Sequence, residues 1–327
     1  MKHVSILVPQ GAMMANIEGP RQLFQCVNQY FAMEGKEPLI SAQLVGIRRE
    51  TQLKDGMYTI RPDKLIGDVQ KTDLIIIPAV DGDMKQVLEA NEEFVPWIVS
   101  QYKRGAEVAS LCVGAFLLAS TGLLNGRKCA THWMYANDFK NMFPEVDLVV
   151  EKIITDEHGI YSSGGAFSYL NLMLHLIEKF AGRNVAVFCA KLFQIDIDRA
   201  TQSPFVIFQG QKDHEDEPVK KAQEFIEKNV SEKITVDQLA TMFAVGRRNL
   251  ERRFKKATSN TIAEYIQRVK MEAAKKHLET SRKNINEVMY DVGYSDTKAF
   301  RTIFKKVTGL SPMEYRNKYN KEALVLA

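Results

Sequence analysis

Short apolar runs alternate with longer amphipathic stretches over the first 200 residues. The apolar runs, rich in β-branched residues, predict buried strands at 4–8, 39–45, 74–77, 107–111, 148–154 and 160–162. The amphipathic stretches predict helices at 20–33, 85–90, 93–103, 115–120 and 166–180. Pro20 suits the first position of its helix, so residues 11–19 are expected to be a loop. This alternation is typical of a parallel sheet covered by helices on both faces.

The last third of the chain shows helical periodicity only, and it contains a repeat. Leu250 and Phe254 recur about 50 residues later as Phe300 and Phe304, each time followed by two lysines. The members of each pair are four residues apart, so they share one helix face. A short apolar helix and a tight turn precede each pair, which predicts two helix-turn-helix units. The helices expected around the first unit span 219–230, 236–243 and 262–278.

Lysine and arginine occupy the outer face of the second helix in each unit. A cationic helix in this position is typical of one that enters the major groove of DNA. A bundle with solvated basic faces would explain one such helix, but two in the same phase argue against it. Ser295 is expected to cap the second of these helices. The expected DNA-binding residues are Arg247, Arg248, Asn249, Arg252, Lys255, Asp296, Thr297, Lys298, Arg301, Thr302 and Lys305.

Residues 285–316 carry a Gly-aromatic-Ser-Asp turn, Phe-x3-Phe and Gly-x-Ser-Pro-x-x-Tyr-Arg, and they resemble the second half of the AraC-type DNA-binding domain. Residues 234–265 resemble its first half. The sequence departs from the family at Gly246, where a Ser cap is usual, and at Met289, where Ala is usual. The resemblance implies a regulator whose two recognition helices reach successive major grooves, about 34 Å apart.

The charge of the chain is divided between its two parts. The net charge is +4, but residues 218–327 carry 23 Lys and Arg against 13 Asp and Glu, or +10, which leaves −6 for the rest. A basic part joined to an acidic one indicates a nucleic-acid-binding module attached to another domain. The expected domains are 1–205 and 218–319, joined by a polar linker at 206–217.

The sequence offers no membrane span, signal peptide or metal site. No apolar run reaches about 18 residues, and the N-terminal run is short. The four cysteines lack paired or metal-ligand spacing, so a reducing cytoplasm is expected, without cofactor or bound metal. The His and carboxylates of 213–217 are interpreted as solvated linker, because sequence neighbours point in different directions.

Cys112 lies where the strand at 107–111 runs into the helix at 115–120. A strand–turn–helix elbow exposes its central side chain above the carboxyl edge of a sheet, and a helix N-terminus favours the thiolate. A small buried cysteine is the plainer alternative.

Residues 108–133 resemble the ThiJ/PfpI branch of the class I glutamine amidotransferase-like fold, in the version fused to AraC-type domains in GlxA-like regulators. The spacing of Cys112 and His132 fits the cysteine–histidine pair of that family. Gly164, Gly165 and the helix with His175 match its closing segment. The resemblance implies a flavodoxin-like α/β domain over about residues 1–200.

The chain departs from the enzymes of that family. They place an acid in the first loop, where this chain has Asn16 and, nearby, Glu18. Val113 stands in place of the usual Thr of the fused regulators, and Asn171 in place of Asp. A binding pocket without catalysis is therefore expected, and no catalytic residue is assigned. The expected pocket residues are Glu18, Cys112, Val113 and His132.

These observations predict an α/β domain followed by an all-α domain with tandem helix-turn-helix units. The expected function is sequence-specific transcription regulation on double-stranded DNA, without enzyme activity. The first domain is expected to bind a small-molecule effector or to form a homodimer. One alternative is a cysteine–histidine enzyme of the ThiJ/PfpI type, an amidase or an aldehyde-handling enzyme, with DNA binding secondary. Another is a DNA-architectural protein with little preference between sequences.

Overall fold

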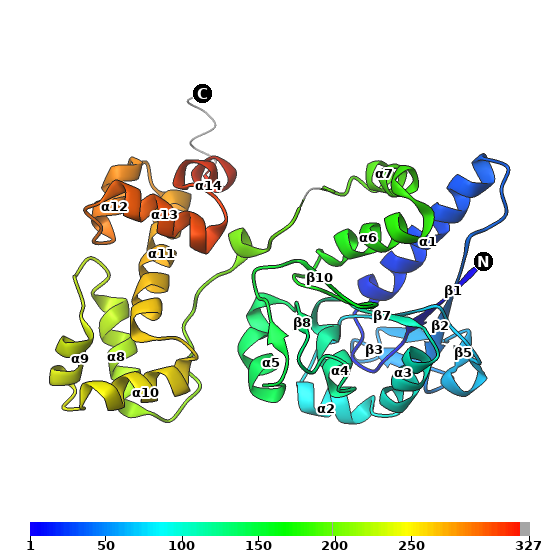
Figure 1. Ribbon diagram of the computed structural model, residues 1–327, viewed down its shortest axis with the longest axis horizontal. Coiled ribbons are helices and arrows are strands. Elements are labelled where there is room, and N and C mark those ends of the chain that lie inside the picture. Colours follow the sequence, from blue (N-terminus) through cyan, green and yellow to red (C-terminus); the bar gives the residue numbers. More distant parts are fainter. Residues whose placement is uncertain (198, 321–327) are drawn as a thin grey trace. The chain divides into compact units, whose positions relative to one another are not determined.

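The computed structural model describes residues 1–197 and 199–320. The chain divides into two compact units, Met1–Gln202 and a second that begins at Ser203 (Figure 1). The domain boundary expected at residue 205 lies close to this division.

The first unit is built on a seven-stranded sheet of order β10-β11-β7-β6-β1-β2-β5. Its strands are β1 (Lys2–Leu7), β2 (Ile40–Gly46), β5 (Lys64–Leu65), β6 (Leu74–Ile77), β7 (Glu107–Ser110), β10 (Ile154–Glu157) and β11 (Ile160–Ser163). All neighbouring strands run parallel except β10, which pairs antiparallel with β11. A flavodoxin-like α/β fold is thereby confirmed for this part of the chain.

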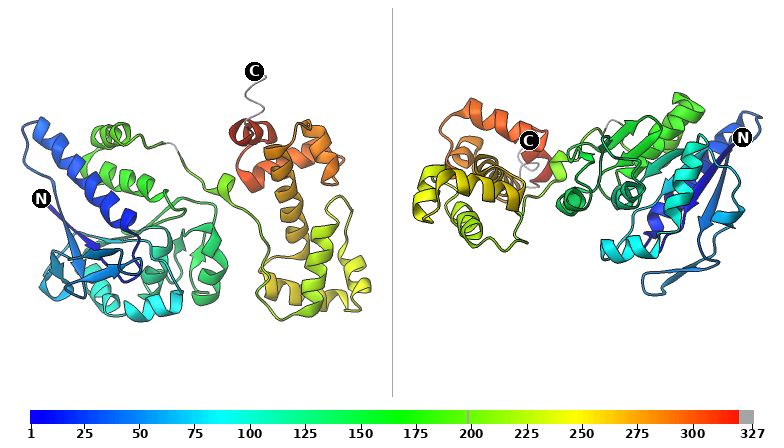
Figure 2. Two further views of the ribbon diagram at one scale, coloured as in Figure 1. Left: turned by 180° about the vertical axis from the view of Figure 1, so that it is seen from behind. Right: turned by 60° about the horizontal axis from the view of Figure 1, so that its bottom comes forward.

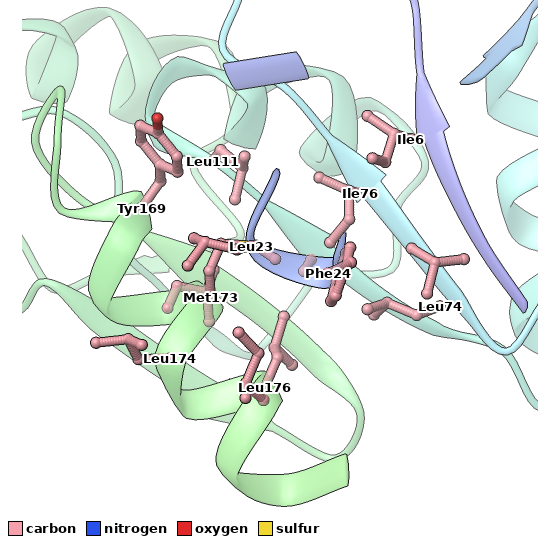
Figure 3. Packing of buried hydrophobic residues seen from close by; sticks show 14 of the residues in the cluster. Ile6, Leu23, Phe24, Leu74, Ile76, Leu111, Tyr169, Met173, Leu174 and Leu176 are labelled. Atoms are coloured by element: carbon pink, nitrogen blue, oxygen red, sulfur yellow. The ribbon is translucent and has the colours of Figure 1, made fainter. Parts of the chain in front are cut away.

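Helices cover both faces of the sheet (Figures 1 and 2). The residues of β6 alternate between the two cores that these helices form with the sheet. Leu74 and Ile76 point to one core, which the helices α1 (Met14–Met33), α6 (Tyr169–Ala181) and α7 (Arg183–Leu192) complete. Ile75 and Ile77 point to the other, which α2 (Met84–Ala90), α3 (Phe94–Lys103), α4 (Ala115–Ser120) and α5 (Ala136–Met142) complete. Successive strand residues face opposite sides, so an unbroken apolar run is needed. Figure 3 shows part of the first core, which contains Phe24 of α1 and Met173 of α6 together with Leu74 and Ile76 of β6.

Helix α1 starts earlier than the sequence predicts. The loop expected at 11–19 and the helix start at Pro20 are wrong, because α1 begins at Met14 and Pro20 lies inside it. Proline within a helix costs about 3 kcal/mol. Burial of Ile17, Leu23 and Phe24 on one face of α1 offsets that cost.

Other short elements also depart from the prediction. The single strand expected at 148–154 is wrong, since the chain there forms β9 (Asp147–Leu148), which pairs with β8 (Lys128–Cys129), and then the start of β10. Helices α5 and α7 and the hairpin of β3 (Thr51–Leu53) and β4 (Tyr58–Ile60) were not anticipated.

The second unit is entirely helical over the residues described. Its helices are α8 (Glu217–Lys228), α9 (Val236–Met242), α10 (Arg247–Thr258), α11 (Ile262–Thr280), α12 (Ile285–Asp291), α13 (Thr297–Thr308) and α14 (Pro312–Tyr319). One core gathers α8, α9, α10 and the first half of α11. Another gathers the second half of α11 with α12, α13 and α14. The long helix α11 therefore carries one helix-turn-helix unit at each end.

The two helix-turn-helix units repeat one another down to single hydrogen bonds. Thr258 and Thr308 each donate through Oγ1 to the carbonyl of the phenylalanine four residues earlier, at 2.8 Å. The Tyr265 hydroxyl donates to Glu227 at 2.7 Å, and the Tyr315 hydroxyl donates to Glu279 at 2.5 Å. This agreement of buried polar contacts shows that the repeat in the sequence is a repeat of tertiary structure.

Residues 206–217 pack along the second unit, whereas the sequence predicts a solvated linker. The carbonyl of Val206 accepts a hydrogen bond from Lys275 at 2.6 Å, and the Phe208 amide donates to Glu272 at 3.0 Å. The Phe208 ring meets the Tyr265 ring edge-on, with centroids 5.1 Å apart. The segment is acidic and polar, but its apolar residues find partners, which a composition-based interpretation does not register.

Candidate nucleic-acid interface and sensory site

The outer face of α10 presents the expected basic residues to solvent. Leu250 and Phe254 are fully buried beneath it, as their spacing predicts. Gly246 is the N-cap and makes no side-chain bond to the helix, which agrees with the loss of a Ser cap noted in the sequence. The exposed residues are Arg247, Arg248, Asn249, Arg252 and Lys255.

These side chains differ in what they already bind. Arg247 pairs with Asp237 at 3.1 Å and with Glu251 at 3.5 Å. Arg252 donates to the Asn249 side chain at 3.0 Å. Arg248 makes no hydrogen bond or ion pair to any residue that the structure describes. Lys255, on the same helix, is also exposed and has no side-chain hydrogen bond or ion pair among the described residues, so both side chains are free to exchange water for another polar group.

Helix α13 carries the second basic face, and its cap differs from the prediction. Ser295 is not the N-cap; Asp296 is, and its carboxylate accepts the Ala299 amide at 2.7 Å. Asp296 therefore serves the start of the helix, where a carboxylate also suits the positive end of the helix dipole. Thr297 is half-buried. The exposed residues expected to face DNA are Lys298, Arg301, Thr302 and Lys305.

Arg253 is an arginine of α10 that the sequence interpretation did not single out. Its guanidinium makes two hydrogen bonds to Asp216, at 2.8 and 2.7 Å, and is half-buried. Asp216 is the N-cap of α8, and the bond from Arg253 holds the pKa of its carboxyl below the usual value. This pair ties the recognition helix to α8. Asp216 belongs to the acidic stretch 213–217, so this carboxylate of the stretch has a structural partner.

In the first unit, four loops meet at the carboxyl edge of the sheet, after β1, β6, β7 and β11. The Met13 amide donates to the Ala79 carbonyl at 2.8 Å, which joins the loops after β1 and β6. The Cys112 amide donates to Ser163 Oγ at 3.2 Å, which joins those after β7 and β11. The Tyr169 hydroxyl donates to the Ala15 carbonyl at 3.0 Å and closes the ring. Open parallel sheets bind ligands at this edge.

Cys112 occupies the elbow that the sequence predicts, but its thiol is buried. Its φ of 53° lies in the left-handed region, and Thr131 holds its carbonyl at 3.0 Å. Only 3% of the residue is exposed, and burial raises the pKa of the thiol to about 12. Val113 beside it is buried to the same degree, with 4% exposed. A neutral thiol is a poor nucleophile.

His132 is not arranged as a base for Cys112. Its Nδ1 accepts the Met134 amide at 3.2 Å, so the proton of the neutral ring lies on Nε2 and no lone pair is left for a thiol proton. Burial also lowers the pKa of His132. The Glu18 carboxylate is partly exposed and is already engaged in an ion pair with Arg21 at 2.7 Å.

Asn16 takes the inward position that an acid would need. Only 2% of Asn16 is exposed, and its amide nitrogen Nδ2 finds no hydrogen-bond partner within the described residues. The Ser168 hydroxyl, before α6, is buried and equally unpartnered there. Asn171, the other departure noted in the sequence, donates to the Asp196 carbonyl at 2.6 Å. An unpaired buried polar atom costs about 1–3 kcal/mol, so two of them on one edge call for an explanation.

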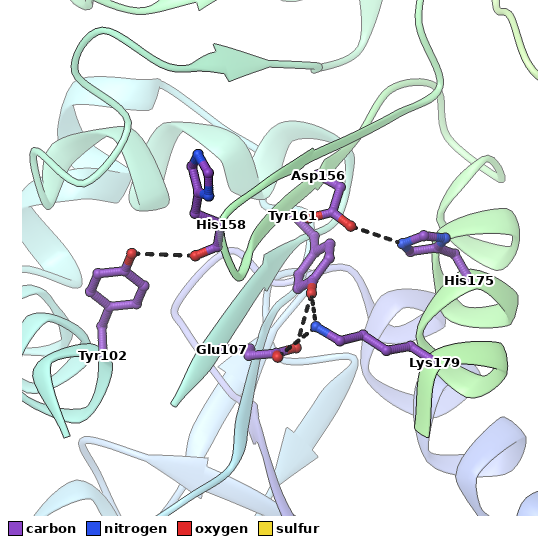
Figure 4. Close-up of polar contacts among 7 residues, drawn as sticks. All are labelled: Tyr102, Glu107, Asp156, His158, Tyr161, His175 and Lys179. Atoms are coloured by element: carbon purple, nitrogen blue, oxygen red, sulfur yellow. Dashed lines mark hydrogen bonds and ion pairs between the residues drawn. The ribbon is translucent and has the colours of Figure 1, made fainter. Parts of the chain in front are cut away.

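A separate polar cluster lies at the opposite end of the strands (Figure 4). Lys179 Nζ lies 2.6 Å from Glu107 and 2.5 Å from the Tyr161 hydroxyl. His175, expected from the sequence to belong to the closing segment, pairs with Asp156 at 3.3 Å in this cluster. Glu107 is the first residue of β7, whereas Cys112 follows its last residue. His175 therefore does not complete the site at Cys112.

The sheet with its cysteine elbow, followed by two matched helix-turn-helix units, defines a class of transcription regulator with a DJ-1/PfpI-type first domain. Residues 3–179 match the DJ-1/PfpI family, and residues 239–318 match a helix-turn-helix domain. The first match spans more than half of the chain, so the chain belongs to the DJ-1/PfpI family.

Two curated transcription regulators are similar to this chain. The HTH-type transcriptional regulator GbdR of Pseudomonas aeruginosa is 27% identical over 279 residues, which is 82% of this chain and 72% of GbdR. GlxA of Rhizobium meliloti is 24% identical over 218 residues, which is 65% of this chain and 66% of GlxA. The chain is thus a DNA-binding transcription regulator with an AraC-type helix-turn-helix domain, as the sequence predicts.

Solved structures agree on the fold of the first unit. An AraC family transcriptional regulator from Pseudomonas putida superposes with a TM-score of 0.51 at 14% identity, over 59% of this chain and 100% of that one. Drosophila melanogaster DJ-1beta gives 0.50 at 16% identity, over 60% and 98%. Among the residues described, none of the helices combines the length and the apolar character that a membrane crossing requires.

Proposed function

We propose that the first domain senses a small molecule that carries a carboxylate, at the edge lined by Asn16, Cys112 and Ser168. The supporting observation is the buried Asn16 amide, a donor without an acceptor. Helices α1 and α6 also begin at this edge, and helix N-termini favour anions. A carboxylate accepts from Nδ2 and from the Ser168 hydroxyl at once. Val113 and the neutral Cys112 thiol supply apolar surface beside it.

The same residues support a role without catalysis. A cysteine enzyme needs a thiolate, a base with a free lone pair and an orienting acid. Here the Cys112 thiol is neutral, His132 is engaged with Met134, and an amide stands where the acid would be. Isonitrile hydratase from Pseudomonas putida is 26% identical over 168 residues, so the family does contain an enzyme relative. The proposed sensor has kept the elbow of such a site and lost the groups that would activate it.

The sensor proposal is tested by thermal unfolding of the full chain with a panel of small carboxylic acids and their matched amides. An acid present at 100 times its Kd should stabilise the protein by about 2.7 kcal/mol. Asn16→Ala should abolish this shift. Glu18→Gln, on the same helix, should leave it unchanged because Glu18 is paired with Arg21. No shift with any acid, or loss of the shift in Glu18→Gln alone, refutes the assignment to Asn16.

We further propose that the two recognition helices bind phosphate alike and read bases differently. Aligned by the repeat, Arg248 matches Lys298 and Lys255 matches Lys305, whereas Arg252 matches Thr302. Shared cations suit a phosphate backbone, which is the same at every step. Positions that differ suit base edges, since Arg favours guanine. The DNA site is therefore expected to have two unlike halves.

Fragments selected from a random DNA pool by the purified protein test this assignment. Arg252→Ala should relax the preference at particular bases of one half only, by about 1–3 kcal/mol per contact. Lys255→Ala and Lys305→Ala should lower the affinity for every DNA sequence by the same factor. Each should also reduce the slope of log affinity against log salt concentration by about one, because one phosphate contact is lost. Equal losses on all sequences in all three variants would remove the distinction. A homodimer and a cytoplasmic site of action remain predictions of the same regulator model.

A further inference from the structure

Lys270 lies near the middle of α11 and is almost completely buried, with 7% exposed. Its ammonium donates to the Glu232 carbonyl at 3.1 Å and to the Val292 carbonyl at 2.9 Å. Glu232 lies in the loop between α8 and α9, and Val292 is the C-cap of α12. The ammonium also lies 5.8 Å from the centroid of the Tyr294 ring. One side chain thus joins the approach to the first helix-turn-helix unit to the turn of the second.

Gly293 brings the two parts into direct contact beside α11. Its φ of 73° is left-handed, and an added Cβ would collide with the Ser231 carbonyl oxygen. The same Cβ would lie 2.6 Å from Lys270 Nζ. The turn can therefore approach this loop only with glycine at the contact. Val230, from the same loop, packs against the cores of both units.

A buried ammonium is not the cheapest way to fill this space. Burial lowers the pKa of Lys270, because desolvation disfavours its charged form. An apolar side chain of similar size would avoid that cost. The ammonium differs from an apolar side chain because its hydrogen bonds are directional. They fix the positions of two carbonyls, one beside each helix-turn-helix unit. The best-attested use of buried polar groups is to select one arrangement among several.

We propose that Lys270, Gly293 and the Ser231–Glu232 loop form a junction that sets the angle between α10 and α13, and so specifies the spacing of the two DNA segments that the protein reads. The 19 residues of α11 span about 28 Å and fix how far apart the units lie. The length of α11 alone leaves the second helix-turn-helix unit free to tilt about the end of that helix. The junction adds a second attachment, and Lys270 acts as a positioning residue that touches no DNA. The proposal rests on DNA reading by both helices.

The DNA helix makes such a junction measurable. One base pair inserted between two contacted segments moves them apart by about 3.4 Å and turns them by about 34–36°. A protein with a fixed angle loses contacts on one segment, and each mismatched position lowers the affinity by about 5- to 150-fold. In a protein with a loosened junction, the second recognition helix can turn with its DNA segment, so both segments stay bound.

The experiment uses duplexes selected from a random pool by the full-length wild-type protein and footprinted to find the two protected segments. They are remade with one base pair added or removed between the segments, and affinities are measured by fluorescence anisotropy at fixed salt. The wild type should prefer the original spacing by about tenfold or more. Lys270→Met should reduce this ratio to within about threefold while the base preferences inside each segment persist. Lys276→Met, an exposed lysine on the same helix, should keep the wild-type ratio.

Two results would overturn the junction. One is a wild type that binds every spacing alike, which needs no variant. The other is a Lys270→Met protein, folded by circular dichroism, that loses affinity by one factor on all spacings, as a purely structural residue would. Gly293→Ala provides an independent test, because it should relax the spacing preference in the same way through its clash with Ser231. Failure to select any duplex would instead remove the DNA-binding function itself.

Discussion

The state of Cys112 gives a sharp prediction about its reaction with an alkylating reagent. Iodoacetamide reacts with the thiolate, so the rate follows the ionised fraction. Burial raises the pKa of Cys112 from 9.0 to about 12. At pH 8 the ionised fraction therefore falls about a thousandfold, from about one in ten to about one in ten thousand. Because only 3% of the residue is exposed, access by the reagent slows the reaction further.

The assay compares alkylation of Cys112 in the native protein and in denaturant, by mass spectrometry of the peptides at pH 8. Native Cys112 should react at least about a thousandfold more slowly than the unfolded chain. Cys26, Cys129 and Cys189 are also buried and report whether the whole domain has opened. Native labelling of Cys112 within about tenfold of the denatured rate, with the other three protected, would refute the reasoning. It would also support the alternative of a cysteine enzyme.

Three further predictions concern stability. Phe254→Ala should cost about 3–5 kcal/mol in urea unfolding followed by circular dichroism, since Phe254 is fully buried against Tyr265; no loss would contradict the first helical core. Asp216→Ala should lower the free energy of unfolding by about 1–3 kcal/mol in the same measurement, because α8 loses its cap and Arg253 loses its partner. Glu215→Ala, at an exposed neighbouring position, is the control and should cause a smaller loss. Burial raises the pKa of Cys112 and of Cys129 to about 12. Between about pH 9 and 12 the unfolded chain therefore loses these protons while the folded protein keeps them. The free energy of unfolding is constant below about pH 9 as far as these two thiols are concerned, and it falls over that range. The urea midpoint by tryptophan fluorescence should fall over that range, and a flat profile would contradict it.

Periodicity and repetition in the sequence are enough to predict the helix-turn-helix units. Leu250 and Phe254, and again Phe300 and Phe304, face inward because four residues make about one helical turn, and this rule is local. The buried strand β6 is also local, since only a strand covered on both faces is apolar at every position. The elbow at Cys112 follows from a strand meeting a helix. Such features depend on neighbours in the chain, which the sequence displays.

Other features depend on contacts between distant segments. The sequence offers Asn16 at the expected acid position and Glu18 nearby, and only the packing of α1 decides that Asn16 is buried and that Glu18 pairs with Arg21. Two residues along a helix turn a side chain by about 200°, so a small uncertainty in register reverses the answer. The sequence also failed to predict that α1 begins before Pro20, because that start too depends on contacts with distant segments. Its helical form is stabilised by burial against the sheet, not by local propensity.

Lys270 shows the limit most clearly. In the sequence it is one of three lysines on α11, and nothing in its neighbours distinguishes it from the exposed Lys276. Its partners, Glu232 and Val292, lie 38 positions before and 22 after it. Spacing along the chain was enough to predict the main strands, most of the helices and the basic helix faces, but not α5, α7 or the hairpin of β3 and β4. Only the tertiary structure decided which charged and polar groups are buried and what they hold, because that depends on which distant backbone atoms the fold brings within hydrogen-bond reach.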